Sequence, residues 1–281
     1  MSLTPARLVP HSLATLLLSL CLLNMAKGEH IIVIDPGHGG QRIVGKTDGT
    51  QGSAGASWNN ATAAKYGILE KDLCLQYSIE LAHTIVDSPR AKKLGIMAAL
   101  TRTDDSHVSA MRRAAIAIHH QARIFLSIHF NGSKKHNAEG TRAYYVSEDH
   151  PDWEFIHFTN PYVERDRALA QRLVKDVSIA LEPYGGDPSK AKISGDAKHD
   201  GGHLNDGIRS LGYARQDTHL YQANVVLLEV EFIDNPKVAE WLLNPLTRDG
   251  ARRAVCKAIT KSLCDHIEND SPPEAPLKSR P

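Results

Sequence analysis

Three residues whose side chains can bind metal or carry protons stand at or near the ends of short aliphatic runs. His38 follows residues 31–34, His129 follows residues 124–128, and Glu229 lies within residues 225–230. Along the chain, 91 positions separate the two histidines and 100 separate His129 from Glu229. In open α/β sheets, ligands bind at the edge formed by the carboxyl ends of the strands. If the three runs are strands of one such sheet, we expect these side chains to converge there.

Two imidazoles and a carboxylate that leave one position open for water are typical of a catalytic zinc site rather than a closed structural one. Zinc lowers the pKa of its bound water to about 7 and so creates a nucleophile at neutral pH. Such a reaction also needs a further carboxylate as general base. Spacing alone does not indicate which glutamate would bind the metal and which would transfer protons.

The segments between these residues alternate between strand and amphipathic-helix patterns, which is typical of a layered α/β domain. Besides the three runs above, strands are expected at residues 96–101 and 141–146. Helices are expected at residues 70–86, 111–120 and 247–267, after a cap at Asp166, and after Asn235. We therefore predict a single α/β domain with a mixed, mainly parallel sheet flanked by helices on both faces.

Two long polar stretches interrupt this pattern, at residues 41–60 and 185–207. Loops of this length inside a compact domain are usually functional or mobile. The second stretch contains His199 and His203, whose spacing of four would suit two metal ligands on one face of a helix. The neighbouring Asp-Gly-Gly sequence argues against a helix, so we expect exposed loop histidines.

The composition excludes several classes of protein. Of the 281 residues, 42% are hydrophobic and 23% are charged, and the formal net charge is +1. Nothing in this composition indicates nucleic-acid binding or a stable membrane anchor. Cys256 and Cys264 would lie about 12 Å apart along a helix, too far for a direct disulfide. A pairing with Cys74 stays open, but the four cysteines do not indicate a disulfide-stapled scaffold.

The N-terminal segment has the pattern of a secretory signal peptide. Arg7 precedes an almost entirely apolar run at residues 13–23, and Ala26 follows at a plausible cleavage point. The run is shorter than the roughly 20 residues that a helix needs to cross a bilayer. A buried N-terminal helix is the main alternative interpretation, and lipid anchoring at Cys21 is a minor one.

This pattern divides the chain into three parts. We expect a signal peptide at residues 1–26, a catalytic domain at 27–270, and a disordered, proline-rich tail at 271–281. Export to the periplasm is expected, with secretion as the alternative.

Several blocks resemble, in the same order, the zinc-dependent N-acetylmuramoyl-L-alanine amidases of the third family, the bacterial cell-separation amidases. They are DPGHGG at residues 35–40, Glu-Lys-Asp at 70–72, Thr-Arg at 101–102, SIHFN at 127–131 and LEVEFIDNP at 228–236. The resemblance implies hydrolysis of the amide bond between N-acetylmuramic acid and L-alanine in peptidoglycan. It also implies that His38, Glu70 and His129 hold zinc and that Glu229 is the general base.

The resemblance carries expectations about partners and leaves rivals open. Amidases of this family are often held inactive by an inserted segment and released by partner proteins, so a protein activator is expected besides the peptidoglycan substrate. One rival function is another zinc hydrolase that acts on muropeptides. A second rival is a non-catalytic wall-binding or regulatory protein on the same scaffold.

The sequence departs from the family pattern at three places, one of which is the stretch at residues 185–207, which is longer than in the family. Between His38 and Glu70 there are 31 residues, so residues 41–69 include an insertion. Glu231 stands where the family has glycine. Strand periodicity would place it on the side of Glu229, but the family glycine indicates a bend, and we expect an outward surface residue.

Three further polar residues, Arg102, Arg113 and Asn131, are weaker candidates for the site. Local structural hydrogen bonds are an equally good interpretation of each.

Overall fold

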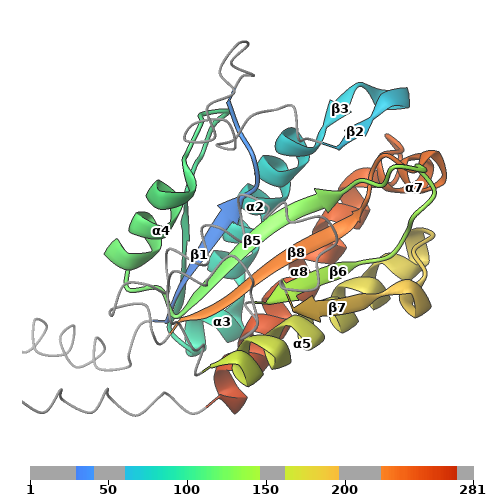
Figure 1. Ribbon diagram of the computed structural model, residues 1–281. Coiled ribbons are helices and arrows are strands. Elements are labelled where there is room, and N and C mark those ends of the chain that lie inside the picture. Colours follow the sequence, from blue (N-terminus) through green and yellow to red (C-terminus); the bar gives the residue numbers. More distant parts are fainter. Residues whose placement is uncertain (1–29, 41–60, 146–161, 196–222, 271–281) are drawn as a thin grey trace, which may run out of the picture.

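The computed structural model describes residues 30–40, 61–145, 162–195 and 223–270. Six strands are β1 (His30–Pro36), β4 (Ile96–Leu100), β5 (Ile124–Asn131), β6 (Arg142–Tyr145), β7 (Lys192–Gly195) and β8 (Asn224–Phe232). They form one sheet in the order β4-β1-β5-β8-β6-β7 (Figure 1).

The directions of the strands decide where the sheet can build a site. The neighbours β4, β1, β5 and β8 run parallel, whereas β6 is antiparallel to β8 and β7 is parallel to β6. The predicted mixed, mainly parallel sheet is therefore confirmed. Every residue of β8 is buried, as expected for a central strand covered on both faces. Because β1, β5 and β8 are parallel, their carboxyl ends lie at the same edge.

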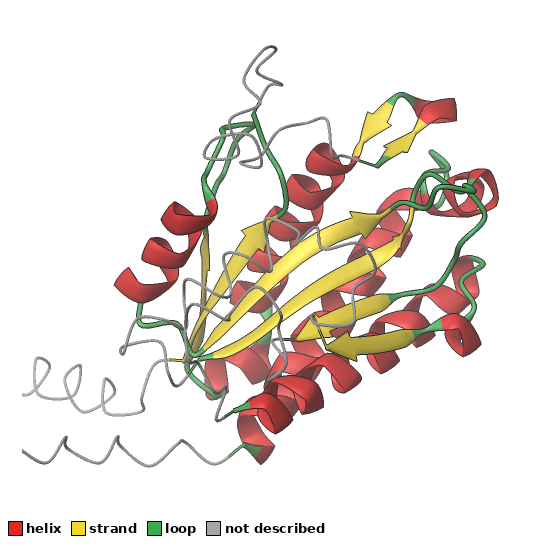
Figure 2. Ribbon diagram, in the orientation of Figure 1, coloured by secondary structure: helices red, strands yellow, loops and turns green. Residues whose placement is uncertain are grey.

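Helices cover both faces of the sheet, as predicted (Figure 2). The long helices α2 (Glu70–Asp87), α5 (Val163–Leu181) and α8 (Arg248–Asn269) pack on one face, and α4 (Ala110–His119) packs on the other. The alternating side chains of β1 show this division. Ile32 and Ile34 belong to the core with the long helices, while Val33 packs with Ala114 and Ala117 of α4. The helices α3 (Pro89–Lys93) and α7 (Pro236–Leu242) are shorter.

A small hairpin, formed by β2 (Thr62–Ala63) and β3 (Ile68–Leu69), precedes α2 and has no counterpart in the sequence predictions. Its turn ends at Gly67, whose φ of 61° lies in the left-handed region. Glu70 N donates to Ala61 O at 3.0 Å, so the hairpin leads directly into the first turn of α2. Strands of two residues are too short to show an alternating pattern, which is why periodicity does not reveal them.

The structure corrects two predicted elements. α5 begins at Val163, so Asp166 lies within its first turn and does not cap it. Instead, the buried Asp166 accepts hydrogen bonds from Val225 N (3.0 Å) and Asn224 Nδ2 (3.2 Å), where β8 begins. In addition, β7 lies within the stretch predicted as a loop. Its pairing with β6 supplies backbone hydrogen bonds that its short, partly polar sequence does not indicate.

Glu231 is a third correction, because β8 continues to Phe232 and does not end at a bend. The register with β5 shifts over residues 129–131, so β8 holds one extra residue there. Glu231 is 2% exposed, and its Oε1 accepts hydrogen bonds from Gly140 N and Phe232 N. Burial raises the pKa of Glu231, and the two backbone hydrogen bonds oppose that rise. The expectation of an outward surface residue is therefore wrong.

Some predictions lie outside the described residues: the segments 1–26, 41–60 and 271–281, and the loop residues His199 and His203. The three cysteines within the described ranges, Cys74, Cys256 and Cys264, are buried and form no disulfide. Among the helices that the structure describes, none is both long and apolar enough to span a membrane.

Candidate metal centre

The carboxyl end of β1 leads into a tight loop, residues 36–40, which we call the His38 loop. His38 has a φ of 56°, in the left-handed region that is uncommon for a residue other than glycine. Glycines on both sides allow close packing. A Cβ on Gly37 would lie 2.4 Å from the His129 ring, and one on Gly39 would lie 2.4 Å from Ser106 O. The bare backbone at Gly37 therefore lets the His38 loop and the His129 imidazole meet.

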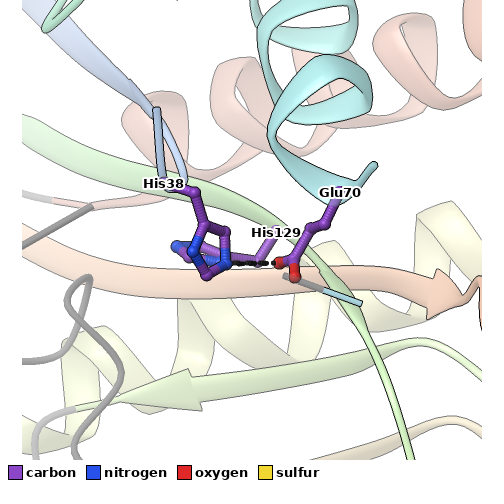
Figure 3. A group of neighbouring side chains, drawn as sticks. All are labelled: His38, Glu70 and His129. Atoms are coloured by element: carbon purple, nitrogen blue, oxygen red, sulfur yellow. Dashed lines mark hydrogen bonds and ion pairs between the residues drawn. The ribbon is translucent and has the colours of Figure 1, made fainter. Parts of the chain in front are cut away.

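His38, Glu70 and His129 come together from the end of β1, the start of α2 and the end of β5 (Figure 3). Glu70 Oε1 lies 3.0 Å from His38 Nε2 and 3.0 Å from His129 Nδ1. The centroids of the two imidazole rings are 4.9 Å apart. One potential ligand atom from each residue lies within 4.8 Å of the others, and all three side chains are buried. A single ion can bridge a group of this size.

Backbone groups hold both oxygens of the Glu70 carboxylate. Phe130 N donates to Oε1 at 3.1 Å, and Ala61 N donates to Oε2 at 3.0 Å. Glu70 is also the first residue of α2, where the helix dipole favours negative charge. Burial alone would raise the pKa of Glu70, but His38 and His129 lower it overall, through their hydrogen bonds and, when a ring is protonated, through its charge. The carboxylate is thus ionised and held in a fixed orientation toward the two imidazoles.

Each imidazole keeps one buried nitrogen, His38 Nδ1 or His129 Nε2, that makes no hydrogen bond in the described part of the chain. Buried polar atoms without partners are uncommon in proteins, and a bound ion is one explanation for them. Burial lowers the pKa of His129, although hydrogen bonding to Glu70 opposes this effect. The neutral ring therefore keeps a lone pair for a metal. Two imidazoles and one carboxylate are a donor set of catalytic zinc sites, so these residues fit a zinc ion.

Glu229 lies beside this group and not within it. It pairs with His129 across the β5–β8 ladder and with Arg142 across the β6–β8 ladder. Neighbouring strands lie about 4.8 Å apart, and residues paired directly across a ladder point to the same face. Glu229 therefore faces the side of the sheet on which His129 stands, and it is 4% exposed. It supplies a second carboxylate next to the three potential ligands.

The sequence profile of the N-acetylmuramoyl-L-alanine amidases matches residues 32–261, a range that contains His38, Glu70, His129 and Glu229. This chain belongs to that amidase family. A relative described as the probable cell wall amidase LytH of Staphylococcus aureus is 29% identical over 228 residues, covering 81% of this chain and 56% of the relative. The chain thus spans little more than half the length of the curated relatives it matches.

Solved amidase structures share the fold. The catalytic domain of CwlV from Bacillus (Paenibacillus) polymyxa var. colistinus has a TM-score of 0.55 at 20% identity, covering 86% of this chain and 99% of that one. The CwlD amidase from Clostridioides difficile, in complex with the GerS lipoprotein, has a TM-score of 0.55 at 16% identity, covering 86% and 100%. At these identities the likeness shows the fold alone, a single α/β domain.

The chain also contains a buried acidic group, centred on Asp35, whose role the sequence patterns did not indicate. Asp35 is fully buried, and its Oδ1 accepts hydrogen bonds from Arg113 Nη1 and Thr101 Oγ1, both at 2.5 Å. Its Oδ2 accepts one from Ser127 Oγ at 2.8 Å. Arg113 also donates to His38 O at 2.5 Å. This group ties β1 to α4, to β5 and to the end of β4, and the sequence signal for it was a hydroxyl residue directly after β4 and another within β5.

The three weaker candidates for the site make structural hydrogen bonds, which are local for Asn131 and long-range for Arg102 and Arg113. Asn131 Oδ1 accepts one from Gly132 N at 2.8 Å, and Arg102 and Arg113 donate to backbone carbonyls of the His38 loop. None of them belongs to the group of three potential metal ligands.

Proposed function

We propose that this chain uses zinc to hydrolyse the amide bond between N-acetylmuramic acid and L-alanine in peptidoglycan. The observation that carries the proposal is the buried group of His38, Glu70 and His129, with Glu229 paired to His129 on the neighbouring strand. Membership of the amidase family supports the choice of bond and substrate.

His38, Glu70 and His129 are proposed to hold the zinc ion. When bound, zinc lowers the pKa of water and polarises a carbonyl group. The fixed carboxylate of Glu70 and the neutral imidazole of His129 keep these ligand atoms in the protonation states that metal binding requires. The buried position of all three excludes bulk water from the ligand atoms.

Glu229 is proposed as the general base. Its carboxylate takes a proton from the attacking water and passes it to the leaving nitrogen of L-alanine as the amide bond breaks. Because the proton leaves with that nitrogen, Glu229 is ionised again for the next turnover. Glu70 is less suited to this task, because its oxygens already bind two imidazoles and two backbone N–H groups.

The proposed substrate lies outside the cytoplasmic membrane, so the proposal includes export. We propose residues 1–26 as a signal peptide, 27–270 as the catalytic domain and 271–281 as a tail, with the periplasm as destination and secretion as the alternative. CwlD in complex with GerS is an amidase of similar fold that binds another protein. This supports, by analogy, a protein activator for the present chain.

Digestion of purified peptidoglycan by the domain without residues 1–26 tests this function. Mass spectrometry should detect intact stem peptides that begin with L-alanine, because only cleavage of the muramyl amide frees that end. A chelator should abolish their release, and added zinc should restore it. Cleavage within the stem peptide would instead indicate another zinc hydrolase of muropeptides. Binding without turnover would indicate a non-catalytic regulator.

A further inference from the structure

The loop that follows β4, residues 101–108, contacts both segments that carry His38 and Glu70. Ser106 and His107 lie so close to Gly39 and Gly40 that neither glycine has room for a Cβ. The two segments are separated by 31 residues in the sequence, so local chain geometry does not fix the distance between them. The contacts made by the 101–108 loop can therefore fix the distance between these two segments.

Arg102 joins the two segments through its guanidinium. Nη2 donates both to Gly37 O (2.7 Å) and to Lys71 O (2.9 Å), so one nitrogen bridges the neighbours of His38 and Glu70 in the chain. Nε donates to Pro36 O at 3.0 Å, and Nη1 donates to Asp104 O at 2.8 Å. The side chain is 4% exposed. Because a guanidinium is planar, its donors hold these carbonyls in a fixed arrangement that a lysine does not reproduce.

Asp105 and Lys71 form a second link between the same segments. Lys71 Nζ donates to Gly40 O at 3.0 Å and to Asp105 Oδ2 at 2.6 Å. Asp105 Oδ1 in turn accepts a hydrogen bond from Gly40 N at 2.9 Å. The three groups close a ring between the His38 loop and the first turn of α2. The Lys71 side chain is buried, whereas the Asp105 side chain is 42% exposed.

We propose that Arg102, Asp105 and Lys71, here called the bracket, are positioning residues that set the separation of His38 and Glu70 and thereby the zinc affinity of the centre. This inference rests on the proposed zinc site. Five of the bracket bonds involve backbone groups of Pro36, Gly37, Gly40 or Lys71, and each of these residues lies within two positions of a proposed ligand. A centre whose ligands are already in place binds its ion more tightly, and loss of such outer support typically reduces affinity about 10–100-fold.

Asp105→Ala tests the bracket at a partly exposed position, where the fold should tolerate the change. We expect zinc affinity, measured by competition with a chromophoric chelator, to fall about 10–100-fold. The absorption spectrum of the cobalt-substituted protein should shift, because the arrangement of the ligands changes. Asp104→Ala is the matched control, since Asp104 is in the same loop and its carboxylate accepts a hydrogen bond from the exposed Ser106 N at 3.0 Å. Its affinity and spectrum should equal those of the wild type.

Arg102→Lys is a second variant that keeps the charge but cannot hold Gly37 O and Lys71 O together. It should also bind zinc more weakly, at a temperature where circular dichroism shows it folded. Arg123→Lys is its control, because Arg123 bonds Asp270 at 2.7 Å at the start of β5 and should affect stability but not zinc affinity. If Arg102→Lys does not fold, the zinc affinity of Asp105→Ala alone tests the role of the bracket.

Two outcomes would overturn the role of the bracket. One is wild-type affinity and a wild-type cobalt spectrum in Asp105→Ala, and the other is an equal loss of affinity in Asp104→Ala. If the wild-type chain itself bound no zinc, the proposed metal site would fail, and the bracket proposal with it. The zinc titration of the wild type therefore separates the two failures.

Discussion

Glu229 and Glu70 both lie next to His129, yet they are proposed to have different tasks. Glu229 is outside the group of potential ligands, so replacing its carboxylate by an amide should leave that group intact. We expect Glu229→Gln to bind zinc in the wild-type amount and to lose about two to four orders of magnitude in kcat, the usual contribution of a general base. Metal analysis and peptidoglycan digestion measure the two quantities. A variant that lost its zinc would show that Glu229 is a ligand.

Glu231 carries a different prediction, because its buried carboxylate supports the backbone at Gly140. Glu231→Gly should lower the free energy of unfolding by about 1–3 kcal/mol, since a buried N–H loses its acceptor. Glu231→Gln keeps an oxygen acceptor without a charge to desolvate. Since burial raises the pKa of Glu231, ionisation weakens the folded state as pH rises from the ordinary value of 4.5 through the raised pKa.

Denaturant unfolding of these two variants, compared with the wild type across that pH range, measures the effect. Glu231→Gln should gain stability relative to the wild type as pH increases. Equal stability of Glu231→Gly and the wild type would contradict the supporting role of this side chain.

At the scale of helices and strands, the sequence predicted the elements that have a strong local pattern. The aliphatic runs at residues 31–34, 124–128 and 225–230 became the central strands, because buried parallel strands are continuously apolar. The strand β7 and the β2–β3 hairpin were missed, since two to four residues show no period and their formation depends on pairing.

The candidate site likewise contains residues that a local sequence pattern predicts and residues that it does not. The positions of His38, His129 and Glu229 after or within apolar runs, together with family motifs that include Glu70, were sufficient to nominate these four residues. The bracket was not predictable in this way. Arg102 bonds backbone carbonyls, and every residue type has a carbonyl, so no residue pattern records its partners.

A buried histidine joins α8 to the rest of the fold and gives a prediction about pH. His266 Nε2 lies 3.1 Å from Asn224 Oδ1 at the start of β8, and Asn224 Nδ2 donates to Asp166 of α5. Burial lowers the pKa of His266 from 6.5 to about 4, an effect that Asp270 opposes and nearby arginines reinforce. The folded state therefore favours the neutral ring. This stabilisation is complete above pH 6.5 and is lost as pH falls toward 4, by about 3 kcal/mol at most.

We expect the wild type to lose more free energy of unfolding between pH 6.5 and pH 4 than His266→Gln, which cannot be protonated in this range. Denaturant unfolding at several pH values measures the difference. The exposed His83 provides a control, because His83→Gln should retain the acid sensitivity of the wild type. If the wild type and His266→Gln lost stability in parallel, His266 would not be a source of the acid sensitivity.

At the scale of the whole molecule, the core extends from Ile32 on β1 to Ile267 on α8. Since these residues bury one another, we expect a chain without residues 1–26 to fold and to hydrolyse peptidoglycan in vitro. In cells the shortened chain should stay in the cytoplasm, because a signal peptide serves targeting and not packing. Cell fractionation tests where the shortened chain is located, and circular dichroism tests whether it folds. An insoluble shortened chain would favour the alternative of a buried N-terminal helix.

Gly37 has a consequence for how loss of function is recognised in related genomes. The His129 ring occupies the space where any side chain at position 37 would begin, only 2.4 Å from the backbone-defined Cβ position. A homologue with alanine there would retain every proposed ligand and the proposed base, and a count of these residues alone would score it as intact. Yet a methyl group would displace the imidazole from its place beside His38. An inactive relative can therefore arise by gaining a methyl group, and its signature is a missing glycine at the position of Gly37.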